Sequence, residues 1–249
     1  MRHLLIALLV LGGMACMSAG AARADGLAAD LSSHVIAITT GFTGTEVVLF
    51  GATDGKGDVI VVVRAPGRPV VVRRKRHIVG MWINTRSVVF SDAPGFYAVY
   101  ASAPLEQIAP AAVLAERQIG MANLRLGQVE GVRSPGELAD YRAALLAEEQ
   151  GEHRYAAETG RIEFLGDRLF RADVALPASV PTGAYLVQVL LLRDKAVISD
   201  HITPLVVSQI GVSAALSDFA ERRALLYGIV AVLGAVAAGW LASLPFRNA

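Results

Sequence analysis

Residues 30–102 alternate between short apolar runs and segments rich in Gly, Pro and Asp. The runs are rich in Val, Ile and aromatic residues: Thr45–Phe50, Asp58–Arg64, Val70–Arg74, Ile78–Asn84, Ser87–Phe90 and Phe96–Ala101. Short strands at this spacing are typical of an antiparallel β-sandwich. Val59–Val63 is apolar at every position, which indicates a strand that is buried on both faces or central in its sheet.

A helical pattern follows. Pro104–Gly120 is rich in alanine, and Pro110 should break or kink this helix. Ser134 and Glu137 have the spacing of a capping box, in which the two side chains bond the free amides at a helix start. This second helix should run to about Glu149. Its apolar face is expected to lie against a sheet and comprises Leu138, Tyr141, Leu145 and Leu146.

The strand pattern then returns. The predicted strands are Arg161–Leu165, Leu169–Leu176, Ala184–Leu192, Ala196–Asp200 and Thr203–Ser208. Alternate positions of the third of them are apolar, as expected when one face packs on a core: Tyr185, Val187, Val189 and Leu191. These strands either close the first β-unit or form a second one. We favour a mainly β fold with two immunoglobulin-like β-sandwich units that share the helical insertion.

The C-terminal segment Leu225–Leu244 contains 20 residues without a charge, between Arg223 and Arg247. A helix that rises ~1.5 Å per residue needs this length to cross a hydrocarbon core of ~30 Å. The sequence therefore predicts one C-terminal transmembrane helix. Small residues recur every four positions on two stripes of this helix: Ala231, Ala235 and Gly239, and Gly234, Ala238 and Ala242. Such stripes let another helix approach closely, so they predict a helix–helix interface. The alternative is that an alanine-rich span produces this spacing by chance.

The N-terminus reads as a secretory signal. A short basic start precedes an apolar stretch, and Ala22-Arg23-Ala24 provides a cleavage site before Asp25. Two alternatives are a lipoprotein modified at Cys16 and an uncleaved signal anchor. Each of these interpretations leaves the middle of the chain outside the cytoplasm.

The expected organisation is a signal peptide (1–24), a first β-sandwich unit (25–103), a helical insertion (104–152), a second β-unit (153–210), a juxtamembrane segment (211–224), a transmembrane helix (225–244) and a short cytoplasmic tail (245–249). The protein should thus be a single-pass protein of a bacterial inner membrane, with most of the chain in the periplasm. The lipid bilayer is its first expected partner.

Charge and cysteine content narrow the function classes. The full chain has 23 Lys and Arg against 22 Asp and Glu, and removing Arg2 and Arg23 with the signal leaves 21 against 22, a net charge of −1. This balance gives no support for nucleic-acid binding through bulk charge. Cys16 is the one cysteine and would leave with the signal, so the mature chain would have no disulfide and no thiol chemistry.

No catalytic or cofactor motif stands out. The histidines of the mature chain lack the spacing of a metal site, and neither G-x-S-x-G nor a phosphate-binding glycine loop occurs. Asp54–Asp58 lacks the ligand order of a calcium loop and is predicted to be a hairpin turn. His34 and Glu46 either line a pocket or lie at the surface. We expect no catalytic residue, no metal and no cofactor.

The strongest local charge feature is a run of four cations, Arg73, Arg74, Lys75 and Arg76, followed by His77. It either contacts anionic lipid headgroups or a small anion, or forms a solvated turn between strands. Trp82 follows and is expected in the core, or at a partner interface beside the basic turn.

Seven segments spread over the chain carry a likeness to a known family: Asp30–Gly51, Asp58–Arg64, Phe96-Tyr97, Phe164-Leu165-Gly166, Leu169–Ala172, Val180–Tyr185 and Gly239-Trp240. In these segments the chain resembles the alphaproteobacterial putative transmembrane protein family. The resemblance implies a signal, an exported region and a C-terminal span, and it carries over no catalytic residue. It also implies a transporter partner, in particular a sulfite-exporter-like permease.

The favoured function is that of a non-enzymatic, membrane-anchored periplasmic protein that acts as an accessory of another inner-membrane protein. The alternative is a membrane-tethered binding module for a small anion or an envelope component. An enzyme with an unfamiliar active site is a third, less supported reading. The sequence does not define the oligomeric state.

Overall fold

The computed structural model describes residues 26–78, 80–210 and 224–243. The predicted signal peptide and cytoplasmic tail, and most of the juxtamembrane segment, lie outside these residues. The strands are β1 (Leu27–Leu31), β2 (Val35–Ile38), β3 (Gly44–Thr53), β4 (Asp58–Arg64), β5 (Gly67–Ile78), β6 (Met81–Pro94), β7 (Tyr97–Ala101), β8 (Val129–Glu130), β9 (Gly160–Arg161), β10 (Glu163–Leu165), β11 (Leu169–Pro177), β12 (Gly183–Arg193) and β13 (Ala196–Gln209). The helices are α2 (Leu105–Ile108), α3 (Ala111–Glu116), the 3₁₀ turn η1 (Met121–Asn123), α4 (Pro135–Gly151) and α6 (Ala224–Ser243).

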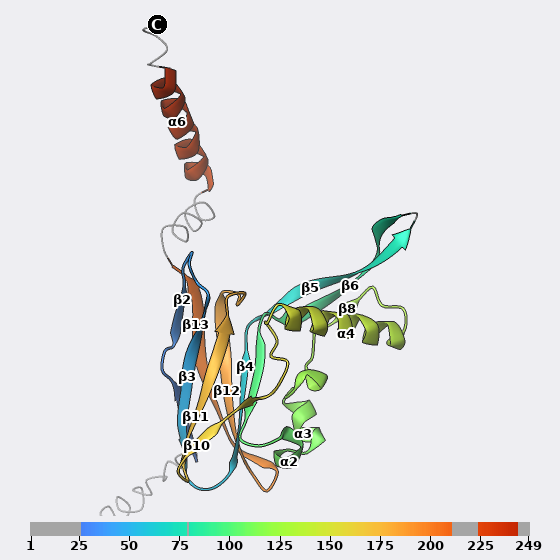
Figure 1. Cartoon of the computed structure of the whole chain (residues 1–249), viewed down its shortest axis with the longest axis vertical. Helices are drawn as coiled ribbons and strands as arrows, with labels where there is room; N and C mark the ends of the chain where they lie inside the picture. Colours follow the sequence, from blue (N-terminus) through green and yellow to red (C-terminus); the bar gives the residue numbers. More distant parts are fainter. Residues whose placement is uncertain (1–25, 79, 211–223, 244–249) are drawn as a thin grey trace, which may run out of the picture.

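Two sheets pack face to face as a β-sandwich (Figure 1). The smaller sheet has the order β1-β3-β11-β10, and the larger has the order β2-β13-β12-β4-β7-β9. Their facing side chains form one core that includes Leu49, Val174, Val61 and Val189, all fully buried. Apolar burial of this extent is the main source of stability for such a fold.

The expected division into two sandwich units is wrong. β3 pairs with β11 from Gly44 to Ala52, and β4 pairs with β12 from Asp58 to Arg64. Each sheet therefore contains strands from both β segments, and the second segment completes the sandwich that the first begins. The strand pattern along the chain has the same period in either arrangement, so it could not distinguish pairing within a segment from pairing across the insertion.

The larger sheet is covered on both faces. In β4, Val59, Val61 and Val63 point into the sandwich core, whereas Ile60 and Val62 belong to a second core on the other side. This confirms the two-sided burial predicted for this strand. The alternation predicted in β12 is also confirmed, because its four alternate apolar side chains all lie in the sandwich core: Tyr185, Val187, Val189 and Leu191.

Helices build the second core. Pro110 occupies the N-cap of α3 and separates it from α2, as predicted. Ser134 Oγ accepts the N–H of Glu137 at 3.3 Å and caps α4. The predicted face of α4 is confirmed: Tyr141 and Leu145 are buried together with residues of the β5–β6 hairpin, and Leu138 and Leu146 pack beside them.

Two predicted turns have other structures. Residues 73–76 lie inside β5, which continues to Ile78, so the basic run is part of a long hairpin with β6 and not a turn. Asp54–Asp58 does not close a hairpin, because β3 and β4 belong to different sheets and the segment crosses between them. Here the Arg193 guanidinium pairs with Asp54, and the Asp58 carboxylate accepts the Ser102 hydroxyl at 3.0 Å.

The C-terminal apolar segment is helical from Ala224 to Ser243. Its described apolar side chains are exposed, among them Leu225, Val232, Leu233, Val236 and Trp240. None of the helices that the structure describes has the length and apolar character needed to cross a membrane.

Candidate functional site

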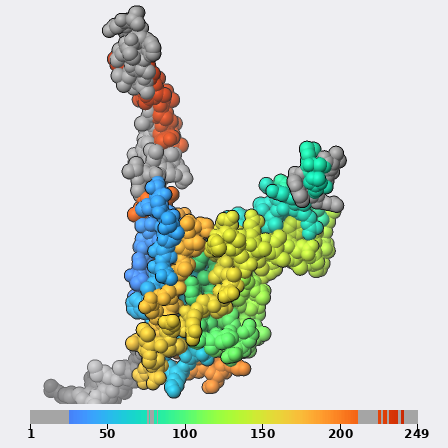
Figure 2. Space-filling model, viewed as in Figure 1, coloured from blue at the N-terminus to red at the C-terminus, as the bar shows by residue number. Residues whose placement is uncertain are grey.

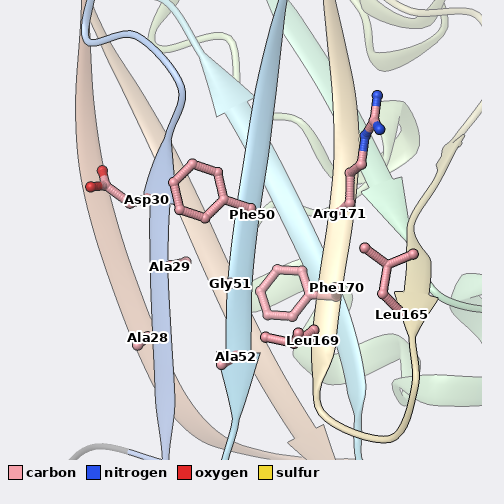
Figure 3. Close-up of a pocket in the computed structure, with 10 residues that line it drawn as sticks. All are labelled: Ala28, Ala29, Asp30, Phe50, Gly51, Ala52, Leu165, Leu169, Phe170 and Arg171. Carbon is pink, nitrogen blue, oxygen red and sulfur yellow. The ribbon is translucent and has the colours of Figure 1, made fainter.

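An apolar groove of about 460 Å³ lies on the outer face of the smaller sheet (Figure 3). Small residues line it in the middle, chiefly Ala28 and Ala52, while Phe50, Leu165 and Leu169 form its walls. These three large side chains are 49%, 58% and 55% exposed. The outer face of a sheet in a sandwich usually carries polar side chains, so this apolar hollow is a candidate contact surface.

The groove has charged residues at one end. Asp30 and Arg171 line it beside Phe50 (Figure 3). The Asp30 carboxylate lies 2.8 Å from His34 Nε2, and Arg171 pairs with Asp173 at 2.8 Å. His34 is therefore an exposed surface residue, and its partner Asp30 lines the groove.

Gly51 and Phe170 shape the sheet beneath the groove. They are directly opposite each other in the β3–β11 ladder, and the Phe170 side chain is 1% exposed. A Cβ atom at Gly51 would lie 2.4 Å from Phe170 Cζ and 2.5 Å from the Ala28 carbonyl oxygen. Glycine is thus required here by the space that the aromatic ring and the neighbouring backbone occupy.

A smaller cavity of about 290 Å³ is lined by two arginines, Arg64 and Arg125, together with Gln118. The Arg64 guanidinium lies 5.7 Å from the centre of the Tyr97 ring, and its Nη2 is 3.5 Å from the Gln118 carbonyl oxygen. Arg64 Nε is buried and has no hydrogen-bond partner among the described residues. A buried donor without an acceptor is costly, which makes this arginine unusual among the residues that line the cavity.

A third cleft, of about 460 Å³, contains Glu46 and His153 beside Tyr100. The Tyr100 hydroxyl oxygen accepts the Ala175 N–H at 3.3 Å. Burial raises the pKa of Tyr100, and the negative charge of Glu46 adds to this, so the phenol is neutral at physiological pH. Glu46 therefore lines a pocket, one of the two alternatives that the sequence left open.

Ion pairs connect the β5–β6 hairpin to the acidic side chains of α4. Three arginines of β5 and β6 pair with three carboxylates of α4: Arg68 with Glu149 at 3.2 Å, Arg74 with Asp140 at 3.1 Å and Arg86 with Glu137 at 2.5 Å. Arg74 also lies 5.3 Å from the centre of the Tyr141 ring. Glu149 is buried and is paired a second time, with Arg154 Nε at 2.6 Å.

The four predicted cations therefore do not form one cluster. Arg74 forms its ion pair with Asp140 of α4. Because side chains alternate along a strand, Arg74 lies on the opposite face of β5 from Arg73 and Lys75. Arg73 and Lys75 are exposed. The side chains of Arg76 and Trp82 lie outside the described residues.

The predicted helix stripe lies on α6. Ala231, Ala235 and Gly239 are exposed, and the space beside Gly234 and Gly239 is open. Ala238 and Ala242 have side chains outside the described residues.

Two buried tyrosines predict a loss of stability at high pH. The Tyr155 hydroxyl donates to the Pro94 carbonyl at 2.9 Å and that of Tyr185 to the Pro181 carbonyl at 2.6 Å. Burial raises the pKa of both well above the ordinary value of 10.0, and Glu149 adds to the effect at Tyr155. The unfolded chain therefore loses these protons first, so the stability present below pH ~10 should fall as the pH rises further.

Urea unfolding at pH ~8 and pH ~11 tests this expectation. The Tyr155→Phe variant should lose about 1 kcal/mol at the lower pH, for the missing hydrogen bond, and show a smaller alkaline loss than the wild type. An equal alkaline loss in both proteins would contradict the role of Tyr155.

Residues 26–248 match the family described as Putative transmembrane protein (Alph_Pro_TM). The chain belongs to this family. The match covers the sandwich, the helical insertion and α6, and confirms the family resemblance. No curated protein and no solved structure matches the chain. The family description names a membrane protein and no activity.

Sequence reasoning missed the groove and the Arg64 cavity in this family member. Phe50, Leu165 and Leu169 come from three different strands, and only the registers of β3 with β11 and of β10 with β11 bring them together. A local signal existed for Phe50, because it occupies an outward position of an alternating strand where a polar residue is usual. Arg64 offered a weaker signal as a charge at the end of a wholly apolar strand.

Proposed function

We propose that this protein is a non-enzymatic accessory of another membrane protein, with α6 as its membrane anchor and the β-sandwich exported to the periplasm. The observation that carries the proposal is the apolar groove of the smaller sheet. A partner segment with one or two apolar side chains would fill it and cover Phe50, Leu165 and Leu169. A sulfite-exporter-like permease is the partner class that the family resemblance suggests.

Two observations support the anchor. The 20 residues of α6 carry no charge, and its described apolar side chains are exposed. Apolar side chains exposed in this number along one helix need an apolar environment. The family description also names a membrane protein.

Affinity purification in a mild detergent tests the groove. The wild-type chain should recover a membrane protein reproducibly, and the double variant Phe50→Thr/Leu169→Thr should lose it. Both side chains are about half exposed and threonine suits a strand, so the variant should fold. The double variant Ala235→Leu/Gly239→Leu makes the corresponding test of the small-residue stripe on α6. Loss of the partner from the α6 variant alone would place the contact on the helix and contradict the groove.

A second candidate function is the binding of a small oxyanion in the Arg64–Arg125 cavity. Two arginines line this cavity, and the buried Nε of Arg64 lacks an acceptor among the described residues. Guanidinium groups bind phosphate and carboxylate oxygens with paired hydrogen bonds. The four cations at residues 73–76 lie further along β5 and do not line this cavity.

Thermal unfolding with added inorganic phosphate, at constant ionic strength, tests this candidate. Phosphate should raise the Tm of the wild type by a few degrees, and Arg125→Gln should abolish the shift. Arg73→Gln/Lys75→Gln is the control at the other cationic surface and should keep the shift. A shift that persists in Arg125→Gln would exclude the cavity.

A further inference from the structure

The far end of the β5–β6 hairpin combines cations with exposed apolar side chains. Arg73 and Lys75 are exposed, and their side chains make no hydrogen bond or ion pair within the described part of the chain. On the returning strand, Met81 is 63% and Ile83 is 41% exposed. Cationic and apolar side chains occur together in segments that lie at the boundary between membrane and water.

The helical layer covers only the first part of the hairpin. α4 contacts β5 from Arg68, near the sandwich, to Arg74. The helix begins at Pro135, and Asp140 in its second turn already pairs with Arg74. The end of the hairpin therefore projects beyond this contact, and Figure 2 shows it rising clear of the rest of the molecule.

The hairpin leaves the sandwich at the end from which the chain continues to α6. Val207, near the end of β13, pairs with Gly183 at the start of β12. Leu186, three residues further along β12, pairs with Arg64 at the end of β4, directly before the hairpin. The base of the hairpin and the exit of the chain toward α6 are thus neighbours, as Figure 1 shows.

The length of the hairpin is similar to the reach of the chain between β13 and α6. β5 has 12 residues and a length of ~40 Å at ~3.3 Å per residue. The chain from Gln209 to Ala224 can span at most ~50 Å when fully extended. The membrane that α6 enters is therefore within reach of the hairpin end.

We propose that the end of the β5–β6 hairpin binds the surface of a bilayer that contains anionic phospholipid. Arg73 and Lys75 contact the headgroups, and Met81 and Ile83 enter the interface. The cations lie on one face of the hairpin and the apolar pair on the other, so an end-on approach brings both sets to the lipid. A second copy of the chain is disfavoured as the occupant, because it would bring the same cations together. This proposal rests on the proposed membrane anchor.

The test uses the full chain with Cys16→Ser and a single new cysteine, Met81→Cys, labelled with an environment-sensitive fluorophore. The protein is reconstituted into phosphatidylcholine vesicles with and without phosphatidylglycerol, and spin-labelled lipid serves as a quencher. The label should be quenched in the anionic vesicles, and more salt should weaken the quenching. Arg73→Glu/Lys75→Glu should lower the partition of the label into the bilayer at least ~10-fold.

Lys56→Glu/Lys195→Glu is the matched control. It reverses two exposed cations at the opposite end of the sandwich and should leave the quenching unchanged. A second label at Leu233→Cys reports the anchor. If lipid quenches the Leu233 label but not the Met81 label, the hairpin proposal is overturned and the anchor stands. If lipid quenches neither label, both fail. Blue-shifted Met81 fluorescence without lipid quenching would assign the hairpin end to a protein contact and also overturn the proposal.

Discussion

Replacing Gly51 by alanine should destabilise the sandwich by ~2–3 kcal/mol, because the added Cβ atom has no room. It would lie 2.4 Å from the Phe170 ring and 2.5 Å from the Ala28 carbonyl oxygen, well inside van der Waals contact. Phe170 is 1% exposed and packs in the sandwich core, so its ring can move only by disturbing its neighbours in that core. The measurement is the urea or thermal midpoint, and Tm should fall by ~5–10 °C.

Gly136→Ala provides the matched control. The substitution is the same, but Gly136 lies in the first turn of α4 and a Cβ atom there meets nothing within 4 Å. Its effect should stay within ~0.5 kcal/mol, and helix propensity favours a small gain. Equal midpoints for the two variants would show that the Phe170 ring does not fill the space beside Gly51 on the core side of the sheet.

Introducing two charges into α6 should release the protein from the membrane. Leu233→Arg and Val236→Arg lie near the centre of the helix, and each arginine costs ~2.5–3.5 kcal/mol of insertion free energy at that depth. The measurement is alkaline carbonate extraction of the membrane fraction. The double variant should appear in the supernatant, whereas the wild type should remain in the pellet.

Leu233→Ala/Val236→Ala is the control for this experiment, since it removes the same side chains without adding charge. It should stay in the pellet with the wild type. Retention of the arginine variant in the pellet would mean that another part of the chain holds the protein at the membrane.

Local features of the fold could be predicted from sequence. Val59–Val63 revealed its two-sided burial by being apolar throughout, and Ser134 and Glu137 marked the start of α4. These signals depend on neighbouring residues and on the period of a single element. The pairing of β3 with β11, more than 100 residues apart, has no such signal, and the number of sandwiches was therefore predicted wrongly.

The same limit applies to the sites. The sequence pointed to residues 73–76 because four consecutive cations are conspicuous. In the structure, side chains alternate along the strand, so Arg74 pairs with Asp140 and Arg73 lies on the other face. The groove could be found only from contacts between residues that are distant in sequence. Its walls come from β3, β10 and β11, and no stretch of sequence contains all of them.

Site-specific photo-crosslinking in native membranes tests the central claim, that the groove is the surface where a membrane-protein partner docks. A photoreactive residue at Leu169 should form one reproducible crosslink to a membrane protein, and Phe50→Thr should remove it. The same residue at Glu106, an exposed position on the helical side of the larger sheet, should give no such product. The groove is not the docking surface if Leu169 gives no crosslink in a folded, membrane-resident protein, or if both positions give the same crosslink.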